Sequence, residues 1–180
     1  FVRIDFEGVE LKYDRSDISD IILSAPKLQE PAQSDKTESS PNAQPAGKDN
    51  VDAFKRGEEF LAKNSLWEAI AAFKESFAAD PADAKSAYNV AGAYFLMGKF
   101  DDAIEWYRKV IAVDKNNVNA YVGLGITSRL TLKYSQATDA LSQAIKLDDK
   151  SVIAMSELAM CYQVQEDWPN AVAWYKKTVA

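Results

Sequence analysis

The sequence contains no histidine and only one cysteine, Cys161, among its 180 residues. Without histidine, neither a Ser-His-Asp triad nor a Cys-His pair can form within this sequence. A zinc site built from cysteine and histidine is excluded for the same reason, and a single cysteine cannot form an intrachain disulfide. These arrangements are therefore excluded. We also predict no other catalytic, metal-binding or cofactor-binding residues and, because of the repeats described below, a protein that is not an enzyme.

A basic surface and a long apolar run are also missing. The 21 Lys and Arg residues are outnumbered by 27 Asp and Glu residues, so the formal net charge is −6. The sequence contains no stripe of basic residues of the kind that indicates nucleic acid binding. No apolar run approaches the roughly 18 residues that predict a membrane-spanning helix. We therefore expect neither a nucleic acid partner nor an integral membrane span.

A regular period is the main feature that the sequence does contain. Four alanines lie in similar local sequences: Ala69, Ala103, Ala137 and Ala171. Successive members are 34 residues apart (103−69, 137−103 and 171−137). A fixed period of about 34 residues is typical of solenoids built from helical hairpins. Such repeat proteins more often hold other proteins than catalyse reactions.

Each repeat unit contains two runs of apolar residues at helical spacing. In the clearest unit, Gly98-Lys99 separates the two runs, and residues 114–117 turn the chain into the next unit. The predicted helix pairs are 51–63 with 66–79, 84–97 with 100–113, 118–131 with 134–147, and 152–165 with 168–180. The predicted fold class is mainly α, an α-solenoid of antiparallel helix pairs over residues 50–180, with repeats at 50–83, 84–117, 118–151 and a truncated 152–180.

The first part of the chain, up to Asp49, follows a different pattern. Residues 1–24 alternate in polarity on either side of Glu7-Gly8, which predicts a β-hairpin, and Ser16 then begins either a short helix or a third strand. Because a lone hairpin is marginally stable, we expect it to complete a sheet whose other strands lie elsewhere or on a partner. It resembles the closing strands of a small SH3-like or LSm-like barrel; the alternative is an extended arm that is only partly ordered. Residues 25–49 are rich in Pro, Ser and Gln and predict a flexible linker.

The units of residues 50–180 resemble the tetratricopeptide repeat, a helix-turn-helix of about 34 residues with small and large residues at fixed positions. The second to fourth units match at Ala87, Val90, Ala91, Tyr94, Ala103, Tyr107; Tyr121, Leu124, Gly125, Ala137, Leu141, Ala144; Leu158, Ala159, Tyr162, Ala171 and Tyr175. The first unit matches at Gly57, Phe60, Ala69, Phe73 and Pro81. The resemblance implies that paired helices approach closely at the small residues. Ser128 departs from the pattern, because the other units carry an aromatic residue there, so we expect looser packing in the third unit.

The resemblance also implies a concave groove, lined by the first helix of each unit, in which family members bind peptides. The candidate groove residues are largely apolar with a few polar groups: Lys85, Tyr88, Asn89, Phe95, Asn119, Val122, Ile126, Arg129, Leu130, Ile153 and Met160. The alternative is that some of these side chains pack between neighbouring first helices. An apolar groove of this kind suits an amphipathic helix or an apolar extended segment.

A subclass of the family grips the C-terminal carboxylates of chaperone tails with Lys, Asn and Arg side chains from three first helices. In this sequence Asn89 matches one position of that clamp. The other clamp positions lack cations and are occupied by Phe54, Glu58, Asn119 and Gly123. We therefore expect that the groove does not bind chaperone tails.

Together, these features predict a non-catalytic protein-protein interaction scaffold or adaptor. One alternative is a structural subunit that forms homo-oligomers through residues 1–13 and through the uncapped end of the solenoid. Another is a targeting module of a longer enzyme. The strands, the linker, the repeats and the non-Met first residue, Phe1, favour a bacterial periplasmic or extracytoplasmic location.

Overall fold

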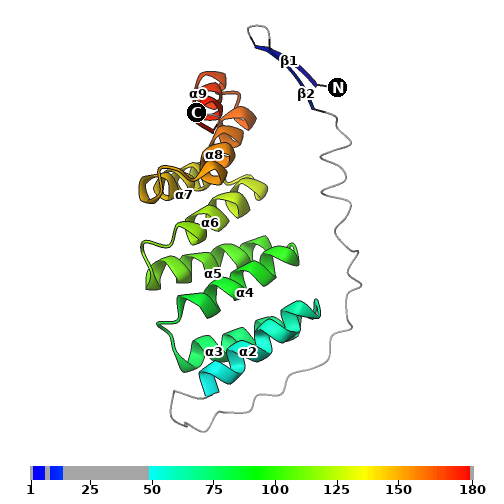
Figure 1. Ribbon diagram of the computed structural model, residues 1–180, viewed down its shortest axis with the longest axis vertical. Coiled ribbons are helices and arrows are strands. Elements are labelled where there is room, and N and C mark those ends of the chain that lie inside the picture. The colour runs from blue at the N-terminus through cyan, green and yellow to red at the C-terminus, as the bar shows by residue number, and fades with distance from the viewer. Residues whose placement is uncertain (1, 7–8, 14–48, 179–180) are drawn as a thin grey trace. The chain divides into compact units, whose positions relative to one another are not determined.

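The computed structural model describes residues 2–6, 9–13 and 49–178 (Figure 1). The chain divides into two units, Phe1–Asn42 and Ala43–Ala180. In the first unit, strand β1 (Val2–Phe6) pairs antiparallel with β2 (Val9–Tyr13), so that Val2 lies opposite Tyr13 and Phe6 opposite Val9. Two strands alone do not support the resemblance to a barrel. The predicted third element after Ser16 and almost all of the predicted linker lie outside the described residues.

The second unit consists of helix pairs stacked in sequence order (Figure 1). The described helices are α2 (Asp49–Ala62), α3 (Leu66–Ala79), α4 (Ala84–Leu96), α5 (Phe100–Val113), α6 (Val118–Leu130), α7 (Tyr134–Leu147), α8 (Val152–Val164) and α9 (Trp168–Thr178). Their ends lie within two residues of the predicted ends, so the helix prediction is confirmed. None of the described helices is long and apolar enough to cross a membrane.

Each turn within a helix pair has the same construction. The second residue after the end of the first helix is left-handed in every unit: Asn64, Gly98, Leu132 and Glu166, with φ of 57°, 70°, 60° and 60°. The next backbone N–H then donates back to a carbonyl five residues earlier, as from Lys99 to Tyr94 at 3.0 Å. This arrangement satisfies the free carbonyls at the helix end. Glycine suits this conformation best, so Leu132 occupies a strained position.

Each turn between units is closed by short side chains of its own. Asp80, Asp114 and Asp148 each accept a hydrogen bond at Oδ1 from the backbone N–H two residues later, at 3.0, 3.0 and 3.1 Å. The next helix is then capped, because the side chains of Asn117 and Ser151 accept bonds from the N–H groups three residues on. These contacts explain why the repeat does not need a proline after every unit.

The small residues of the repeat lie where the helices of a pair approach most closely. The four periodic alanines are at most 2% exposed. A Cβ atom added to Gly57 would lie 2.5 Å from the Phe73 ring, and one added to Gly125 would lie 2.5 Å from Leu141. Real Cβ atoms do not approach other atoms so closely. The predicted close approach of the paired helices is therefore confirmed.

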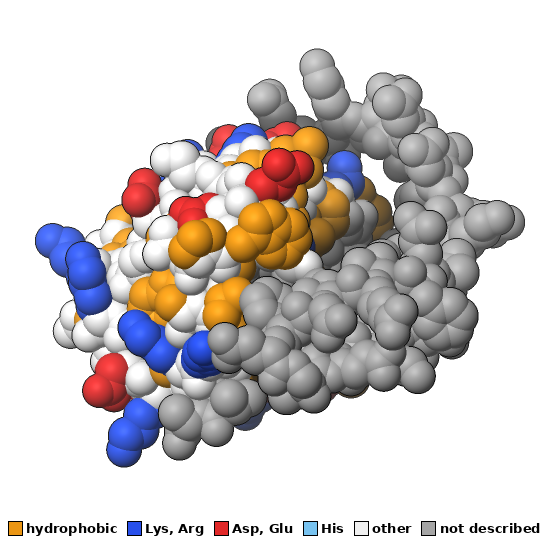
Figure 2. Space-filling view, turned by 90° about the horizontal axis from the view of Figure 1, so that it is seen from above, with side chains coloured by type: hydrophobic (Ala, Val, Ile, Leu, Met, Phe, Trp, Pro, Cys, Tyr) orange, Lys and Arg blue, Asp and Glu red, His pale blue; other side chains and the backbone are white. Residues whose placement is uncertain are grey.

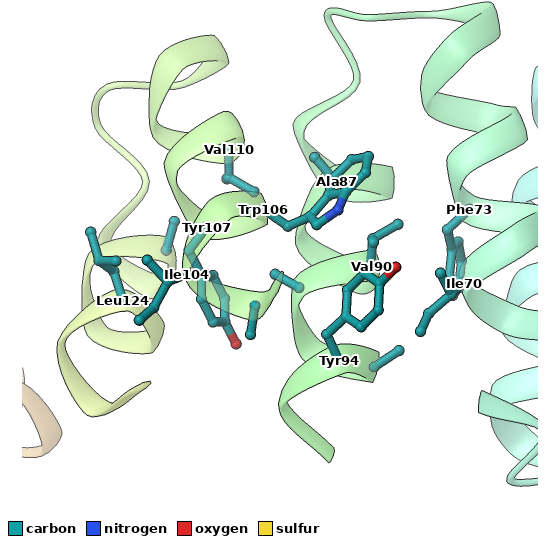
Figure 3. Close-up of a cluster of buried hydrophobic side chains, with 14 of the residues drawn as sticks. Ile70, Phe73, Ala87, Val90, Tyr94, Ile104, Trp106, Tyr107, Val110 and Leu124 are labelled. Atoms are coloured by element: carbon teal, nitrogen blue, oxygen red, sulfur yellow. The ribbon is translucent and has the colours of Figure 1, made fainter. Parts of the chain in front are cut away.

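The buried side chains form two clusters. The larger cluster extends from α3 to α7 and includes Phe73, Val90, Tyr94, Trp106 and Tyr107, which Figure 3 shows pointing into the space between neighbouring helices. The smaller cluster lies on α7 and α8 and is made of Leu141, Leu158, Cys161 and alanines. Both clusters lie inside the stack, so one side of each first helix is left for solvent or a partner.

Candidate functional site

The eleven candidate groove residues lie on the first helices α4, α6 and α8, and none of them is fully buried. Lys85, Asn119, Leu130 and Ile153 are exposed, and the other seven are half-buried. Residues on the opposite side of α4, such as Ala87, Val90 and Ala91, are completely buried. The helical spacing therefore presents the candidate residues on one accessible side, which we call the first-helix surface.

The aromatic members of this surface also serve the core. The Tyr88 ring meets Tyr107 edge to face at a centroid distance of 5.8 Å, and Phe95 lies 5.7 Å from Phe100. Burial raises the pKa of both Tyr88 and Tyr107 above the usual tyrosine value, and the neighbouring Tyr88 adds to the effect on Tyr107. Both contacts are with α5, the second helix of the same unit, so they do not test the alternative that groove residues pack between neighbouring first helices.

A polar pocket of about 600 Å³ lies at the start of α4 and α6. Its lining consists of Phe54, Ala82, Asp83, Ala84, Lys85, Tyr88, Asn89, Asp114, Asn117 and Asn119. The two aspartates are engaged in turns and caps, since Asp83 accepts from the Lys85 N–H and Asp114 from the Asn116 N–H. The side chains of Lys85, Asn89 and Asn119 have no partner among the described residues. The pocket therefore offers an ammonium group and two amides to a ligand from outside, beside the carboxylates of Asp83 and Asp114.

Arg129 is engaged within the chain. Its Nε donates to Glu157 Oε2 at 2.8 Å, and the two side chains are only 18% and 17% exposed. This ion pair joins α6 to α8 directly. The prediction placed Arg129 in the groove as a polar contact, but the structure shows that its charge is already neutralised by Glu157, so it is less available to an acidic partner than Lys85.

The remaining candidate residues form an apolar area on α6 and α8. Val122, Ile126, Leu130 and Met160 are accessible to different degrees, and Ile153 is 62% exposed. Figure 2 views the molecule from above and shows hydrophobic side chains among charged ones at the α8–α9 end. The first-helix surface therefore changes from polar at the start of α4 and α6 to apolar on α8.

The prediction missed some residues of this surface. Asp83 and Asn117 line the polar pocket but lie in turns rather than in first helices. Leu96 is 63% exposed and lies one full repeat before Leu130, so the repeat spacing was a signal that could have identified it. Within residues 49–178, no group of three or more Cys, Asp or Glu side chains is arranged to hold a metal ion.

Comparison with known sequences identifies the repeats. A family model described as TPR repeat matches residues 91–127, and one described as tetratricopeptide repeat matches residues 132–180. Superkiller protein 3 of Schizosaccharomyces pombe is 34% identical over 84 residues, which are 47% of this chain and 6% of that protein. A probable UDP-N-acetylglucosamine–peptide N-acetylglucosaminyltransferase SPINDLY of Hordeum vulgare is 33% identical over 79 residues, which are 44% of this chain and 8% of that protein. The chain thus spans under a tenth of the length of these curated relatives.

Solved structures share the same fold. A crystal structure of MamA protein has a TM-score of 0.71 and 26% identity, covering 73% of this chain and 72% of MamA. The first TPR of Spaghetti (RPAP3), bound to the HSP90 peptide SRMEEVD, has a TM-score of 0.63 and 22% identity, covering 66% of this chain and 94% of that one. The second TPR domain of human RPAP3, in complex with the HSP70 peptide SGPTIEEVD, has a TM-score of 0.60 and 23% identity, covering 63% of this chain and 94% of that one.

These complexes correct one of the sequence predictions. The exclusion of chaperone tails is wrong, because two domains of the same fold hold HSP90 and HSP70 peptides. The absence of cations at the clamp positions therefore does not exclude such a peptide. The fold instead gathers Lys85, Asn89 and Asn119 around one pocket, so a cation and two amides face it together even though the expected positions lack cations.

The helix pairs repeat at a constant period, the family models match within them, and solved TPR structures superimpose on them. These three findings agree on the same part of the chain. Residues 91–127 and 132–180 of this chain are tetratricopeptide repeats.

Proposed function

We propose that this chain is a non-catalytic protein-interaction module that binds a peptide or a partner helix on the first-helix surface. The observation that carries the proposal is the polar pocket, which Lys85, Asn89 and Asn119 line without partners among the described residues. Unpaired donors of this kind favour a ligand with an acceptor-rich group, such as a carboxylate. The peptide-bound RPAP3 domains, which share the fold, support an interaction role.

The change from polar to apolar along the surface indicates how a ligand would lie. An acidic group of the ligand meets Lys85 at the start of α4, and apolar side chains pack against Ile126 on α6 and Met160 on α8. Because the helices are already ordered before binding, the surface itself loses little conformational entropy. The surface therefore selects a peptide that carries both an acidic group and apolar side chains.

A displayed library of random peptides, selected on the intact chain, would test this proposal. We expect enriched peptides to bind the wild type and to lose at least tenfold in affinity when Tyr88, Ile126 and Leu130 are all changed to Asp. The matched control is Ala112→Asp, since Ala112 is exposed on the second helix α5. Peptides that bind the triple variant as tightly as the wild type would contradict the proposal.

A second candidate function is self-association through the hairpin. Each strand of the two-stranded sheet has a single neighbour among the described residues, so each has an outer edge that can add a strand from another copy. Light scattering of the chain with and without residues 1–24 would test this. We expect a larger species only when the hairpin is present; a monomer in both forms would contradict self-association.

A further inference from the structure

The glycines of the first helices differ in what surrounds them. A Cβ atom on Gly57, Gly123 or Gly125 would lie 2.5 Å from the side chain of Phe73, Tyr107 or Leu141. Packing within the chain therefore requires glycine at these three positions. A Cβ atom on Gly92 would have no neighbouring atom within 4 Å. Neither packing nor a left-handed backbone requires glycine at position 92.

Glycine is nevertheless a poor choice for this position. Gly92 lies in the interior of α4, where alanine forms a more stable helix because it loses less backbone entropy on folding. An alanine at this position would also fit, since the space is open. Packing and helix stability therefore do not account for a glycine at this position.

The neighbours of Gly92 belong to the first-helix surface. Tyr88 and Asn89 precede it by four and three residues, and Phe95 and Leu96 follow it by three and four, so all four share its side of the helix. Tyr88 and Asn89 line the polar pocket. The equivalent positions one and two repeats further on, in α6 and α8, are apolar. Gly92 is therefore an open position, bordered by aromatic and aliphatic side chains, within the surface proposed to bind a peptide.

We propose that Gly92 is a specificity-determining residue, whose missing side chain admits one large apolar side chain of a bound peptide. This proposal rests on the proposed function of the first-helix surface. Tyr88 and Phe95 contact the incoming side chain from both sides, while the backbone of α4 lies beneath it. A large side chain at position 92 would occupy the same space and exclude the ligand side chain, and a methyl group would narrow that space.

The charge next to this position defines the rest of the ligand. Lys85 lies seven residues before Gly92, which is about 10 Å along the helix at roughly 1.5 Å per residue. Its ammonium group has no partner in the described part of the chain, so it favours a carboxylate. In an extended peptide, about 10 Å corresponds to roughly three residues at about 3.3 Å each. The ligand is therefore an extended peptide in which an acidic group lies a few residues from a Leu, Met or Phe.

The peptides enriched by the library selection would test this proposal through two variants, Gly92→Ala and Gly92→Leu. We expect Gly92→Ala to raise the midpoint of thermal unfolding and to weaken peptide binding at least threefold. Gly92→Leu should weaken binding at least tenfold. The matched control Ala112→Leu adds a large side chain to the exposed side of α5 and should leave the affinity within twofold.

A double-mutant cycle would separate this contact from general effects on the fold. Changing the large apolar residue of the peptide to Ala should cost the wild type at least tenfold in affinity but should cost Gly92→Leu less than threefold. If the peptides do not bind the triple Asp variant but bind Gly92→Leu as tightly as the wild type, the role of Gly92 is overturned and the proposed function remains intact. If the selection yields no peptides that bind the first-helix surface, both the role of Gly92 and the proposed function are overturned.

Discussion

The two halves of the solenoid share one backbone pattern but fill it with different side chains. Between α3 and α5, aromatic rings meet edge to face, with Phe77 and Trp106 at a centroid distance of 5.5 Å. The Nζ atoms of Lys74 and Lys109 lie 5.5 and 3.8 Å from the Trp106 centroid. The position one repeat after Trp106 is Ala140. The third unit, made of α6 and α7, therefore buries a smaller side chain at this position than the second unit does.

The second half also contains a buried polar group without a partner. Ser128 is fully buried, and its Oγ atom has no hydrogen-bond partner in the described part of the chain. At the equivalent position of the preceding unit, the Tyr94 hydroxyl accepts a bond from Lys74 at 2.7 Å. The looser packing predicted for the third unit stays a prediction, because a missing hydrogen bond does not measure packing. Because repeats contact mainly their neighbours, the second half should unfold before the first.

The largest expected effect lies in the first half. Trp106→Ala removes a 9% exposed ring that contacts Phe77 and two lysines. Truncation of a buried aromatic side chain typically costs about 3–5 kcal/mol in unfolding free energy, and urea denaturation would measure it. The matched comparison is Trp174→Ala, at the equivalent position of the last unit, where the ring is only partly buried. An equal loss in both variants would contradict the difference between the halves.

An effect of pH is expected in the second half. Burial raises the pKa of the Cys161 thiol from its ordinary 9.0 to about 11, with Glu157 adding to the rise and Arg129 opposing it. The unfolded chain therefore releases this proton more readily than the folded chain. The protonated thiol therefore contributes about 2–3 kcal/mol to the unfolding free energy. This contribution is fully present below the thiol pKa of the unfolded chain and is lost as the pH rises through the thiol pKa of the folded chain.

The comparison of wild type with Cys161→Ala isolates this effect. Tyr88 and Tyr107 also have raised pKa values, so both proteins should become less stable in alkali. The wild type should lose more unfolding free energy between pH 9 and 11 than the variant does. Parallel pH curves would show that the thiol is not the responsible group.

A stabilising substitution would sharpen the comparison further. Ser128→Ala removes a buried hydroxyl that has no hydrogen-bond partner among the described residues. Leaving a polar group buried and unpaired costs about 1–3 kcal/mol, so the variant should be more stable by about 1 kcal/mol. Thermal unfolding would measure the gain. The control is Ser86→Ala, which removes a hydroxyl that donates to Ser76 at 2.9 Å and should destabilise the protein.

The smallest expected effect concerns the turn of the third unit. Leu132 is left-handed, with φ of 60°, and is 70% exposed, whereas Gly98 occupies the equivalent position of the second unit. Leu132→Gly removes the steric penalty but adds freedom to the unfolded chain, so we expect a net gain of about 0.5–1 kcal/mol. The reverse change, Gly98→Leu, should destabilise the protein. A loss of stability in Leu132→Gly would show that the Leu side chain makes a compensating contact.

Much of this architecture was predictable because its causes are local. The constant repeat spacing and the turn at Gly98 define the helix ends, and the small residues at Gly57 and Gly125 indicate where the paired helices approach closely. The polar pocket was not predictable, because it depends on how α4 and α6 are oriented relative to each other. For the same reason, the sequence did not reveal that Arg129 pairs with Glu157, which belongs to the next unit.

The turns between units have a consequence for the length of the array. Each turn satisfies its own backbone groups, through an aspartate such as Asp114 and a cap such as Asn117. A whole unit could therefore be duplicated or deleted at these points without leaving a broken hydrogen bond at the junction. Gene duplication could lengthen or shorten the ligand-facing side by one helix at a time, and new specificity would then require only surface substitutions on the added helix.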